Sequence, residues 1–465
     1  MTAPARSKFH QQKLFVSRGL KLTLCLAMTL ALPLTLMMTL SNQTTLPAAA
    51  TGQKQAKARG LEAEISTGYC LKIAAKVDAL VTSTFFDQAL VKSAWAPAYE
   101  TMKKEFADKK TAPTNLVALD RRINECLHSL KTSHCQFVTS NDESFYFLHS
   151  LFADISRKFA RRPHAWPYPI ACTGMTTGGC GFGDDRVRYV LDGSPAEKAG
   201  LQIGDKILTV ASRPYSGYLD FIDQENKSLA VEIERQGSRS TLTLKPVEKK
   251  LYSLYVEATK ASKRIIKQGD HRFGYVHLWS GGTAAVNAVT DILGTDSEFR
   301  NVDGLIYDLR DGYGGASLED LDIFYRPAAA FPDFVTKDRT GKSEDERMFF
   351  DKPMVALINS GSRSGKELLA YSLKHSGRAL LVGENTAGFV VAGSLTPLDD
   401  QCALYLAVMD LSLKSVDKNG DTVRLEGVGV APDMAVPNKS MDQLGYGTQL
   451  SAAIEALEKR LASQN

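Results

Sequence analysis

Residues 354–393 constrain the fold more than any other stretch, because they predict a strand, a loop, a helix and a second strand in immediate succession. The run at 354–358 is apolar throughout, as a buried strand requires, and a second apolar run begins at Leu380. The intervening helix places Leu368, Leu369 and Leu373 on one face. From Arg272 to about Val436 apolar strands also alternate with helical stretches, which predicts an α/β core. Its strands are expected at 274–277, 304–308, 353–358, 379–382 and 402–409.

Ser364 lies where the loop of this segment enters the helix. Free backbone N–H groups and the helix dipole favour negative charge at such a position, so a hydroxyl there could act as a nucleophile beside an oxyanion site. The alternative is a structural role in which Ser364 is only the N-cap and Glu367 closes a capping box. The segment by itself leaves both interpretations open.

Three motifs in a fixed order resemble the tail-specific, or C-terminal processing, serine proteases. Ser364 and Glu367 occupy the places of that family's serine and of the glutamate three residues later. Residues 302–315, VDGLIYDLRDGYGG, resemble its strand-and-loop signature, and residues 426–433, EGVGVAPD, resemble its closing motif. The resemblance covers roughly residues 120–440 and implies a crotonase-like protease core of ββα repeats.

The base that activates the serine differs between two branches of this family. The better-known branch uses a lysine 25 residues after the serine, a position that is Phe389 in this chain. Lys366 lies close in sequence, but at the start of a helix it should point away from Ser364. The sequence therefore argues against a Ser–Lys dyad.

The second branch, typified by the tricorn proteases, uses a histidine oriented through a serine and a glutamate. Its histidine motif matches Ser133 and His134, followed by Cys135 where threonine is usual. Its glutamate matches Glu426, at the head of the closing motif. The resemblance thus implies that His134 takes the proton from Ser364 and returns it to the leaving amine, with Ser133 and Glu426 holding the imidazole.

Backbone N–H groups are the expected oxyanion donors. Gly365 follows the nucleophile at the helix start, and Gly314 of the RDGYGG loop would supply the second donor. Gly315 is a near-equal candidate, since one sequence does not fix which amide points inward. Asp308 and Arg310 are expected to pair structurally beneath this loop.

Residues 174–248 resemble a PDZ domain through the run GSPAEKAGLQIGDKILTV at 193–210. A short helix is expected at 195–199, a strand at 206–210, and paired strands at 229–234 and 240–245. PDZ domains bind an extended chain end as an added strand, with a glycine-rich loop holding the carboxylate. That peptide-binding loop would comprise Gly179, Cys180, Gly181 and Phe182. A different small β-barrel is the alternative.

The N-terminus resembles an export signal. Residues 22–40 carry no charge, basic residues precede them, and LPAAA at 46–50 offers small residues for cleavage. An uncleaved signal anchor is the alternative, because a run of this length could nearly span a bilayer. The expected location is the periplasm or the exterior, with a membrane tether if cleavage does not occur.

Composition excludes some function classes. A net charge of +4 over 465 residues argues against a nucleic-acid partner bound through a basic face. Without Cys25 of the signal, six cysteines remain, a number that permits disulfides; Cys172 and Cys180 are the closest local pair. No paired cysteine or histidine spacing suggests a metal site, and no cofactor is expected.

The expected organisation runs from signal peptide to C-terminal helix. It comprises a signal peptide or anchor at 1–50, a linker at 51–60, a helical region carrying the histidine loop at 61–165, the PDZ domain at 174–248, the α/β serine protease core at 250–440, and a C-terminal helix at 441–465.

The functional prediction is an exported serine endopeptidase that cleaves polypeptide substrates, selected through C-terminal tails at the PDZ domain. The sequence leaves the oligomeric state open, with a homo-oligomer as one alternative. One alternative is a catalytically inactive PDZ-containing peptide-binding or scaffold protein, which Phe389 at the lysine position permits. A binder of apolar small molecules in the crotonase-like cleft is a further alternative. The joint presence of Ser133, His134, Ser364 and Glu426 favours the protease.

Overall fold

The computed structural model of the chain describes residues 64–155, 170–172, 175–177, 186–325, 334–337, 339–341, 343–346, 349–414, 422–438 and 443–463. The predicted signal segment and the PDZ loop of Gly179, Cys180, Gly181 and Phe182 lie outside these ranges. Within them, no helix combines the length and apolar character needed to cross a bilayer.

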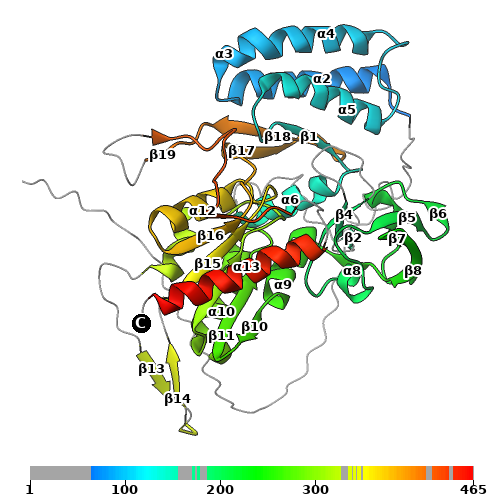
Figure 1. Cartoon of the computed structure of the whole chain (residues 1–465). Coiled ribbons are helices and arrows are strands. Elements are labelled where there is room, and N and C mark those ends of the chain that lie inside the picture. Colours follow the sequence, from blue (N-terminus) through cyan, green and yellow to red (C-terminus); the bar gives the residue numbers. More distant parts are fainter. Residues whose placement is uncertain are drawn as a thin grey trace, which may run out of the picture. The chain divides into compact units, whose positions relative to one another are not determined.

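A six-stranded sheet forms the centre of the α/β core (Figure 1). Its strand order is β10-β11-β12-β15-β16-β21. The β10–β11 pair is antiparallel and every later pair is parallel. The strands are β10 (Arg264–Gln268), β11 (His271–His277), β12 (Gly304–Asp308), β15 (Met354–Ile358), β16 (Ala379–Gly383) and β21 (Met434–Ala435). The strands expected at 304–308 and 354–358 are therefore confirmed.

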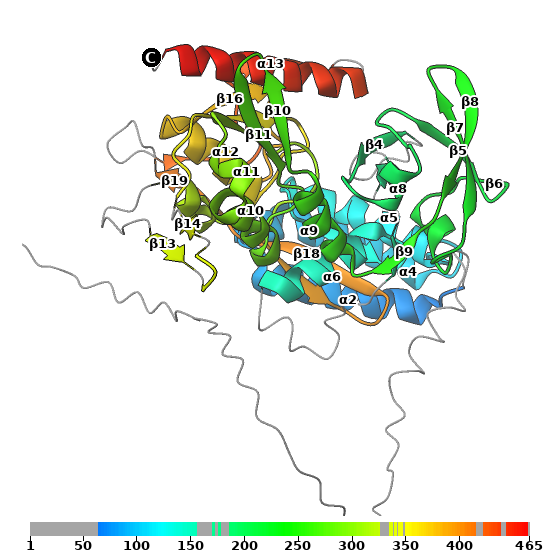
Figure 2. The same cartoon turned by 90° about the horizontal axis from the view of Figure 1, so that it is seen from below.

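Helices cover both faces of this sheet, which explains why its central strands are apolar throughout. Successive strand residues point to opposite faces, so Tyr307 packs with α10 (Thr283–Thr295) and α12 (Gly365–His375). Ile306 instead packs against α13 (Gln443–Ala462), which crosses the other face (Figure 2). Further helical segments of the core are α9 (Leu251–Ala261), α11 (Ser297–Arg300) and the 3₁₀ segment η4 (Leu318–Phe324).

The N-terminal helices pack on a separate antiparallel sheet of order β1-β18-β17 (Figure 1). Its strands are β1 (Gln136–Thr139), β17 (Ala392–Pro397) and β18 (Cys402–Met409). The helical segments are α2 (Thr67–Thr84), α3 (Gln88–Leu90), the π-helix η1 (Val91–Trp95), α4 (Ala96–Ala107), α5 (Leu116–Leu127), the 3₁₀ turn η2 (His128–Leu130) and α6 (Glu143–Ile155). Of these, α2 to η2 share one hydrophobic cluster with the sheet.

One expectation for this region was wrong, and one strand was not predicted. The apolar run at 402–409 is a strand, but it does not belong to the α/β core sheet, because Leu404 and Leu406 of β18 pack among the N-terminal helices. Residues 136–139 lie between the loop of His134 and the next helix, and they form the strand that pairs with β18. Strand periodicity reports burial and does not report which sheet provides the partner.

The module that resembles a PDZ domain contains a four-stranded sheet of order β6-β5-β7-β8. The expected strand at 206–210 and the hairpin that follows it are confirmed. Its elements are β4 (Val187–Val190), α8 (Pro195–Lys198), β5 (Lys206–Val210), β6 (Arg213–Pro214), η3 (Tyr218–Phe221), β7 (Leu229–Arg235) and β8 (Ser238–Leu244). Four two-stranded pairs complete the fold: β2 (Ile170–Cys172) with β9 (Val247–Lys249), β3 (Met175–Thr177) with β4, β13 (Phe334–Lys337) with β14 (Ser343–Glu346), and β19 (Leu413–Lys414) with β20 (Thr422–Val423).

The cysteines whose side chains the structure describes carry free thiols. They are Cys70, Cys126, Cys135 and Cys402. Burial raises the pKa of the Cys135 thiol to about 11, so it is not a reactive thiolate at neutral pH. The suggested Cys172–Cys180 pair lies outside the residues whose side chains are described.

Candidate active site

Ser364 stands between strand β15 and helix α12, half-buried at the helix N-terminus. Its backbone has φ 56° and ψ −127°, a conformation that non-glycine residues rarely adopt. Two acceptors hold it there: the Ser364 N–H donates to Phe389 O at 2.9 Å and to Glu367 Oε2 at 3.1 Å. Strained backbone of this kind persists only where its surroundings enforce it, and it occurs often at catalytic residues.

Glu367 fixes the loop beside the serine. Its buried carboxylate accepts hydrogen bonds from Thr386 Oγ1 at 2.6 Å, from Gly388 N at 2.7 Å and from Phe389 N at 2.8 Å, in addition to the Ser364 amide. Burial raises the pKa of this carboxyl. The segment around Phe389 therefore supports the serine through its backbone.

The imidazole of His134 faces the serine hydroxyl. His134 Nε2 lies 3.2 Å from Ser364 Oγ, and His134 Nδ1 lies 2.8 Å from Ser133 Oγ. The Ser133 hydroxyl donates to Glu426 Oε2 at 2.9 Å, so its oxygen is left to accept the proton carried by Nδ1. This assigns the tautomer: Nδ1 is protonated, and Nε2 presents its lone pair to Ser364.

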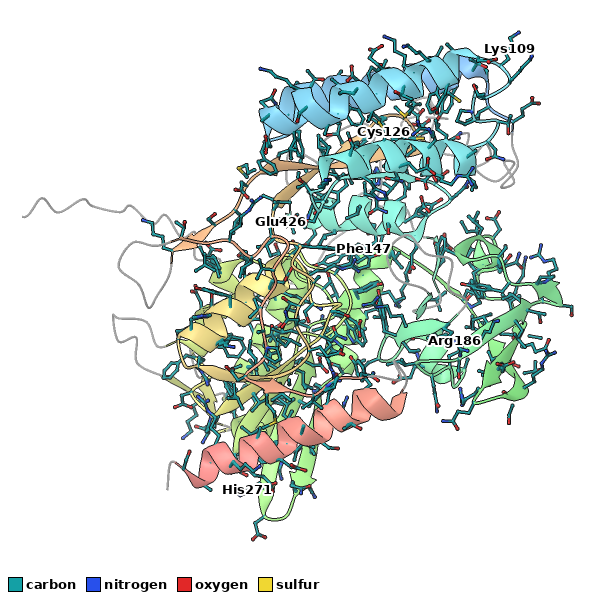
Figure 3. All side chains as sticks on the ribbon, turned by 45° about the horizontal axis from the view of Figure 1, so that its top comes forward. Lys109, Cys126, Phe147, Arg186, His271 and Glu426 are labelled. Atoms are coloured by element: carbon teal, nitrogen blue, oxygen red, sulfur yellow. The ribbon has the colours of Figure 1, made fainter. Side chains whose placement is uncertain are left out.

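Glu426 joins the histidine loop to the α/β core, and Figure 3 shows it at the junction of the two. Its Oε1 accepts the Ser133 N–H at 2.8 Å and its Oε2 accepts the Val390 N–H at 2.7 Å. The ring of Tyr405 packs against the His134 ring at a centroid distance of 5.1 Å. The four expected side chains are thus brought together from three separate stretches of sequence.

The electrostatics of this group favour a neutral histidine. Burial lowers the pKa of His134 to about 4, with Arg363 acting in the same direction and Glu426 partly opposing it. His134 therefore remains unprotonated across the neutral range and is able to accept a proton. The backbone φ of His134 is 58°, in the left-handed region that non-glycine residues rarely adopt. The loop that carries the imidazole is therefore conformationally constrained.

The two glycines expected as oxyanion donors lie against the serine. A Cβ on Gly314 would lie 2.5 Å from Ser364 Cβ and 3.0 Å from Ser364 Oγ, and one on Gly365 would lie 2.1 Å from Ala316 O. Only glycine permits both approaches. Within the described part of the chain, neither amide donates to a protein acceptor, so both are available to a substrate oxygen.

A buried polar network supports the RDGYGG loop. Asp308 and Arg310 pair in the interior as expected, and Arg310 lowers the pKa of the Asp308 carboxyl against the effect of burial. Asn359, which the sequence interpretation missed, accepts the Asp311 N–H at 3.0 Å and donates to the Asp311 carboxylate at 3.0 Å. A polar residue directly after the buried strand 354–358 was the available signal for it. Among the described residues, no cluster of three or more His, Cys, Asp or Glu is arranged to hold a metal ion.

Two family models match this chain. Residues 272–436 match Peptidase family S41, and residues 186–235 match the PDZ domain. The first match covers the loop of Gly314, the serine and Glu426, and it includes strands β17 and β18 of the antiparallel sheet as well as most of the α/β core. The second covers the module that follows the histidine loop.

Several known proteins are similar to this chain. The chain is 30% identical over 282 residues to carboxyl-terminal-processing peptidase 3, chloroplastic, of Arabidopsis thaliana, covering 56% of this chain and 51% of that protein. It is 26% identical over 282 residues to a carboxyl-terminal-processing protease of Picosynechococcus, covering 57% and 64%. A solved photosystem II D1 C-terminal processing protease aligns at 19% identity and a TM-score of 0.45, covering 79% of this chain and 92% of the other.

The chain spans about half the length of the first of these curated relatives and 64% of the second. The expected α/β fold with a PDZ domain and an N-terminal helical region is confirmed. The motifs, the S41 match and the PDZ match concern the same residues in the same order. The chain is thus similar to the tail-specific, or C-terminal processing, proteases: residues 272–436 match Peptidase family S41, and residues 186–235 match the PDZ domain.

Proposed function

We propose that this protein is a serine endopeptidase that hydrolyses polypeptides through an acyl-enzyme on Ser364, with His134 as general base. The 3.2 Å approach of His134 Nε2 to Ser364 Oγ carries the proposal, because a serine hydroxyl is a weak nucleophile without a base in reach. This arrangement is that of the histidine-using branch of the family. The lysine branch has its base at the position of Phe389. Phe389 supports the serine only through its backbone and has no basic side chain.

The reaction follows from the tautomer. As Ser364 Oγ attacks the scissile carbonyl carbon, its proton passes to His134 Nε2. The resulting imidazolium is stabilised through Nδ1–H to the Ser133 hydroxyl, which in turn donates to Glu426. The N–H groups of Gly314 and Gly365 donate hydrogen bonds to the carbonyl oxygen as it becomes negatively charged.

The attack of Ser364 gives a tetrahedral intermediate, and its collapse completes the acylation half of the reaction. The C–N bond breaks as His134 Nε2–H protonates the leaving amine, and the acyl group remains on Ser364. A water molecule then gives its proton to His134 and attacks the ester, and the acid product leaves as the proton returns to Ser364.

We also propose that the PDZ domain recruits substrates by their C-terminal tails and that the protein is exported. The PDZ match supports recruitment, since such domains bind chain ends by strand addition. The uncharged run at 22–40 after a basic segment supports export. Amino-terminal sequencing of the mature protein tests export: a new terminus near residue 50 is expected, whereas an intact Met1 on a soluble cytoplasmic protein would contradict it.

Fluorophosphonate labelling tests the catalytic proposal. The full chain is treated with the probe, and the modified residue is located by mass spectrometry in the wild type, Ser364→Ala and His134→Ala. Label on Ser364 that is lost in both variants is expected, together with cleavage of casein by the wild type alone. An unlabelled wild type, with and without a C-terminal peptide bound to the PDZ domain, would favour the inactive peptide-binding alternative.

A further inference from the structure

Lys366 is a fully buried lysine two residues after the nucleophile. It is the second residue of α12, and its side chain is 0% exposed. Its Nζ donates to Asp311 O at 2.7 Å and to Trp279 O at 3.3 Å. Lysine is almost never fully buried without specific partners, so this placement calls for a physical reason.

Both acceptors of Lys366 belong to the support of the oxyanion loop. Asp311 opens the DGYGG segment that carries Gly314. Trp279 follows strand β11, and its carbonyl also accepts the Tyr313 N–H at 3.0 Å. The ammonium group therefore ties together the start of the nucleophile helix, the oxyanion loop and the end of β11.

The loop packs directly on this ammonium group. A Cβ on Gly312 would lie 3.3 Å from Lys366 Nζ and 1.9 Å from Trp279 O. Asp311 itself has φ 48°, a left-handed conformation that its contacts must maintain. Without the lysine, the carbonyls of Asp311 and Trp279 would lose a charged donor, and the loop would lose one of its links to the helix that starts at the serine.

We infer that Lys366 is a positioning residue for the oxyanion hole: its ammonium group holds the loop so that the Gly314 amide faces the oxygen of the tetrahedral intermediate. This inference rests on the proposed function. It assigns Lys366 no proton transfer with Ser364. It acts through Gly314, whose amide contributes to rate only while it is correctly placed.

The charge of Lys366 depends on its neighbours. The charged or titratable groups that face it are Asp308 of β12, Asp311 of the loop, Arg363 of the nucleophile loop and His277 of β11. Burial lowers the pKa of Lys366 to about 7, although Asp308 and Asp311 oppose this effect. Lys366 therefore carries an ammonium group with three N–H donors below about pH 7. Above that pH it loses a proton and keeps two N–H donors.

The test compares two lysines of one helix. Lys366→Met removes the ammonium but keeps a long apolar side chain, and Lys374→Met is the matched control, because Lys374 Nζ donates to Ala431 O at 2.8 Å at the far end of α12. Both full-length variants and the wild type are assayed for kcat and KM on a quenched peptide derived from a casein cleavage site, between pH 5.5 and 9. Thermal midpoints and Ser364 labelling stoichiometry are measured in parallel.

The expected result separates catalysis from stability. Lys366→Met should lower kcat by about 10- to 100-fold with KM within about twofold, while Lys374→Met matches the wild type. The thermal midpoint of Lys366→Met should also fall, because the carbonyl of Asp311 loses its charged donor, so kcat is compared per mole of Ser364 that takes the label. In the wild type, kcat should decline above about pH 7, and this decline should be absent from Lys366→Met.

Three outcomes would overturn the inference. The first is a kcat of Lys366→Met equal to that of the wild type. The second is a loss of activity fully accounted for by a lower fraction of Ser364 that takes the label, which indicates a folding role only. The third is a kcat of Lys366→Met that declines above pH 7 as steeply as that of the wild type, because the decline would then have another cause. Failure of the wild type to label at Ser364 would instead reject the proposed function, and this inference with it.

Discussion

The nucleophile segment and the histidine loop are built in opposite ways. Ser364 is held by regular structure: a buried strand before it, a helix after it, and the buried carboxylate of Glu367 beside it. His134 lies in a short loop at the edge of the N-terminal helical region, where Lys131 and His134 both have positive φ. Its position depends on a single half-buried carboxylate, Glu426, that reaches it from a distant part of the chain.

This difference indicates that Ser364 is held more firmly in place than His134. The hydrogen bonds of Glu367 remain within the α/β core and stabilise it, whereas those of Glu426 connect two separately packed regions. Changes around the serine should therefore appear as lost stability. Changes around the histidine should appear as lost activity in a protein that remains folded.

Glu426→Gln is expected to give the largest effect. The Glu426 carboxylate accepts hydrogen bonds from three donors. In the glutamine variant an NH₂ group, which can only donate, replaces one of the two accepting oxygens. If the amide NH₂ faces the Ser133 hydroxyl, that hydroxyl no longer enforces protonation at Nδ1, and kcat should fall about 10³-fold with little change in the thermal midpoint. Steady-state kinetics and calorimetry check this. Glu197→Gln, which alters a carboxylate that accepts the Gly193 N–H in the PDZ domain, is the control. Equal activity of the two variants would contradict the dependence of His134 on Glu426.

Glu367→Gln tests the other half of the comparison. Four donors converge on this fully buried carboxylate, and an amide leaves some of them facing another donor. We expect the free energy of unfolding to fall by about 3 kcal/mol, measured by urea denaturation. A variant as stable as the wild type but inactive would remove the distinction drawn between the two carboxylates.

The pH dependence of kcat/KM reports the state of the histidine. Because burial lowers the pKa of His134 to about 4, its neutral form persists as pH falls, and activity should decline only below about pH 4 to 5. At pH 5 this corresponds to about 30-fold more activity than an ordinary histidine with a pKa near 6.5 would support. Stopped assays across pH 3.5 to 7 check it, and an acid limb near 6.5 would contradict the prediction.

The fold must be monitored in the same experiment. Burial also lowers the pKa values of His149 to about 4 and of His277 to about 3, so both remain neutral in the folded state while they would bind protons when unfolded. The unfolded state thus binds more protons as pH falls below 6.5, and stability decreases in that direction. Circular dichroism at each pH separates this loss of stability from protonation of His134.

The same contrast explains what the sequence could predict. Strands at 304–308 and 354–358 are recognisable because both faces are buried and the runs are apolar throughout. Ser364, His134 and Glu426 were assigned through the resemblance of short motifs to a family, since no local pattern links residues hundreds of positions apart. The structure places them together, and their catalytic roles remain the proposal tested above.

Other features have no local signal. The π-π contact of Tyr405 with His134 depends on strand β18 joining the N-terminal sheet, which its own alternation of residues does not report. Lys366 was expected to point away from Ser364, and its Nζ indeed bonds elsewhere, but its acceptors are backbone carbonyls that any residue could supply. Main-chain partners leave no mark in the amino-acid sequence.

A charged pair links the PDZ domain to the oxyanion loop, and its loss gives the smallest expected effect. Arg188 of β4 lies with its Nε 3.2 Å from Asp311 Oδ1, in the loop that carries Gly314. The Asp311 side chain is 4% exposed and that of Arg188 is 25% exposed, so solvent only partly screens the pair. The oxyanion loop is therefore held by the core through Asn359 and by the PDZ domain through Arg188.

Arg188→Ala should lower kcat about three- to tenfold on a short peptide, because Asp311 keeps Asn359 and the loop loses only one of its contacts. Arg235→Ala is the matched control, since Arg235 pairs with Asp205 inside the PDZ domain and touches no part of the loop. Equal losses in the two variants would mean that a loosened PDZ domain is responsible. A loss confined to Arg188→Ala would mean that the oxyanion loop depends on the PDZ domain, although Ser364 itself is held by the α/β core.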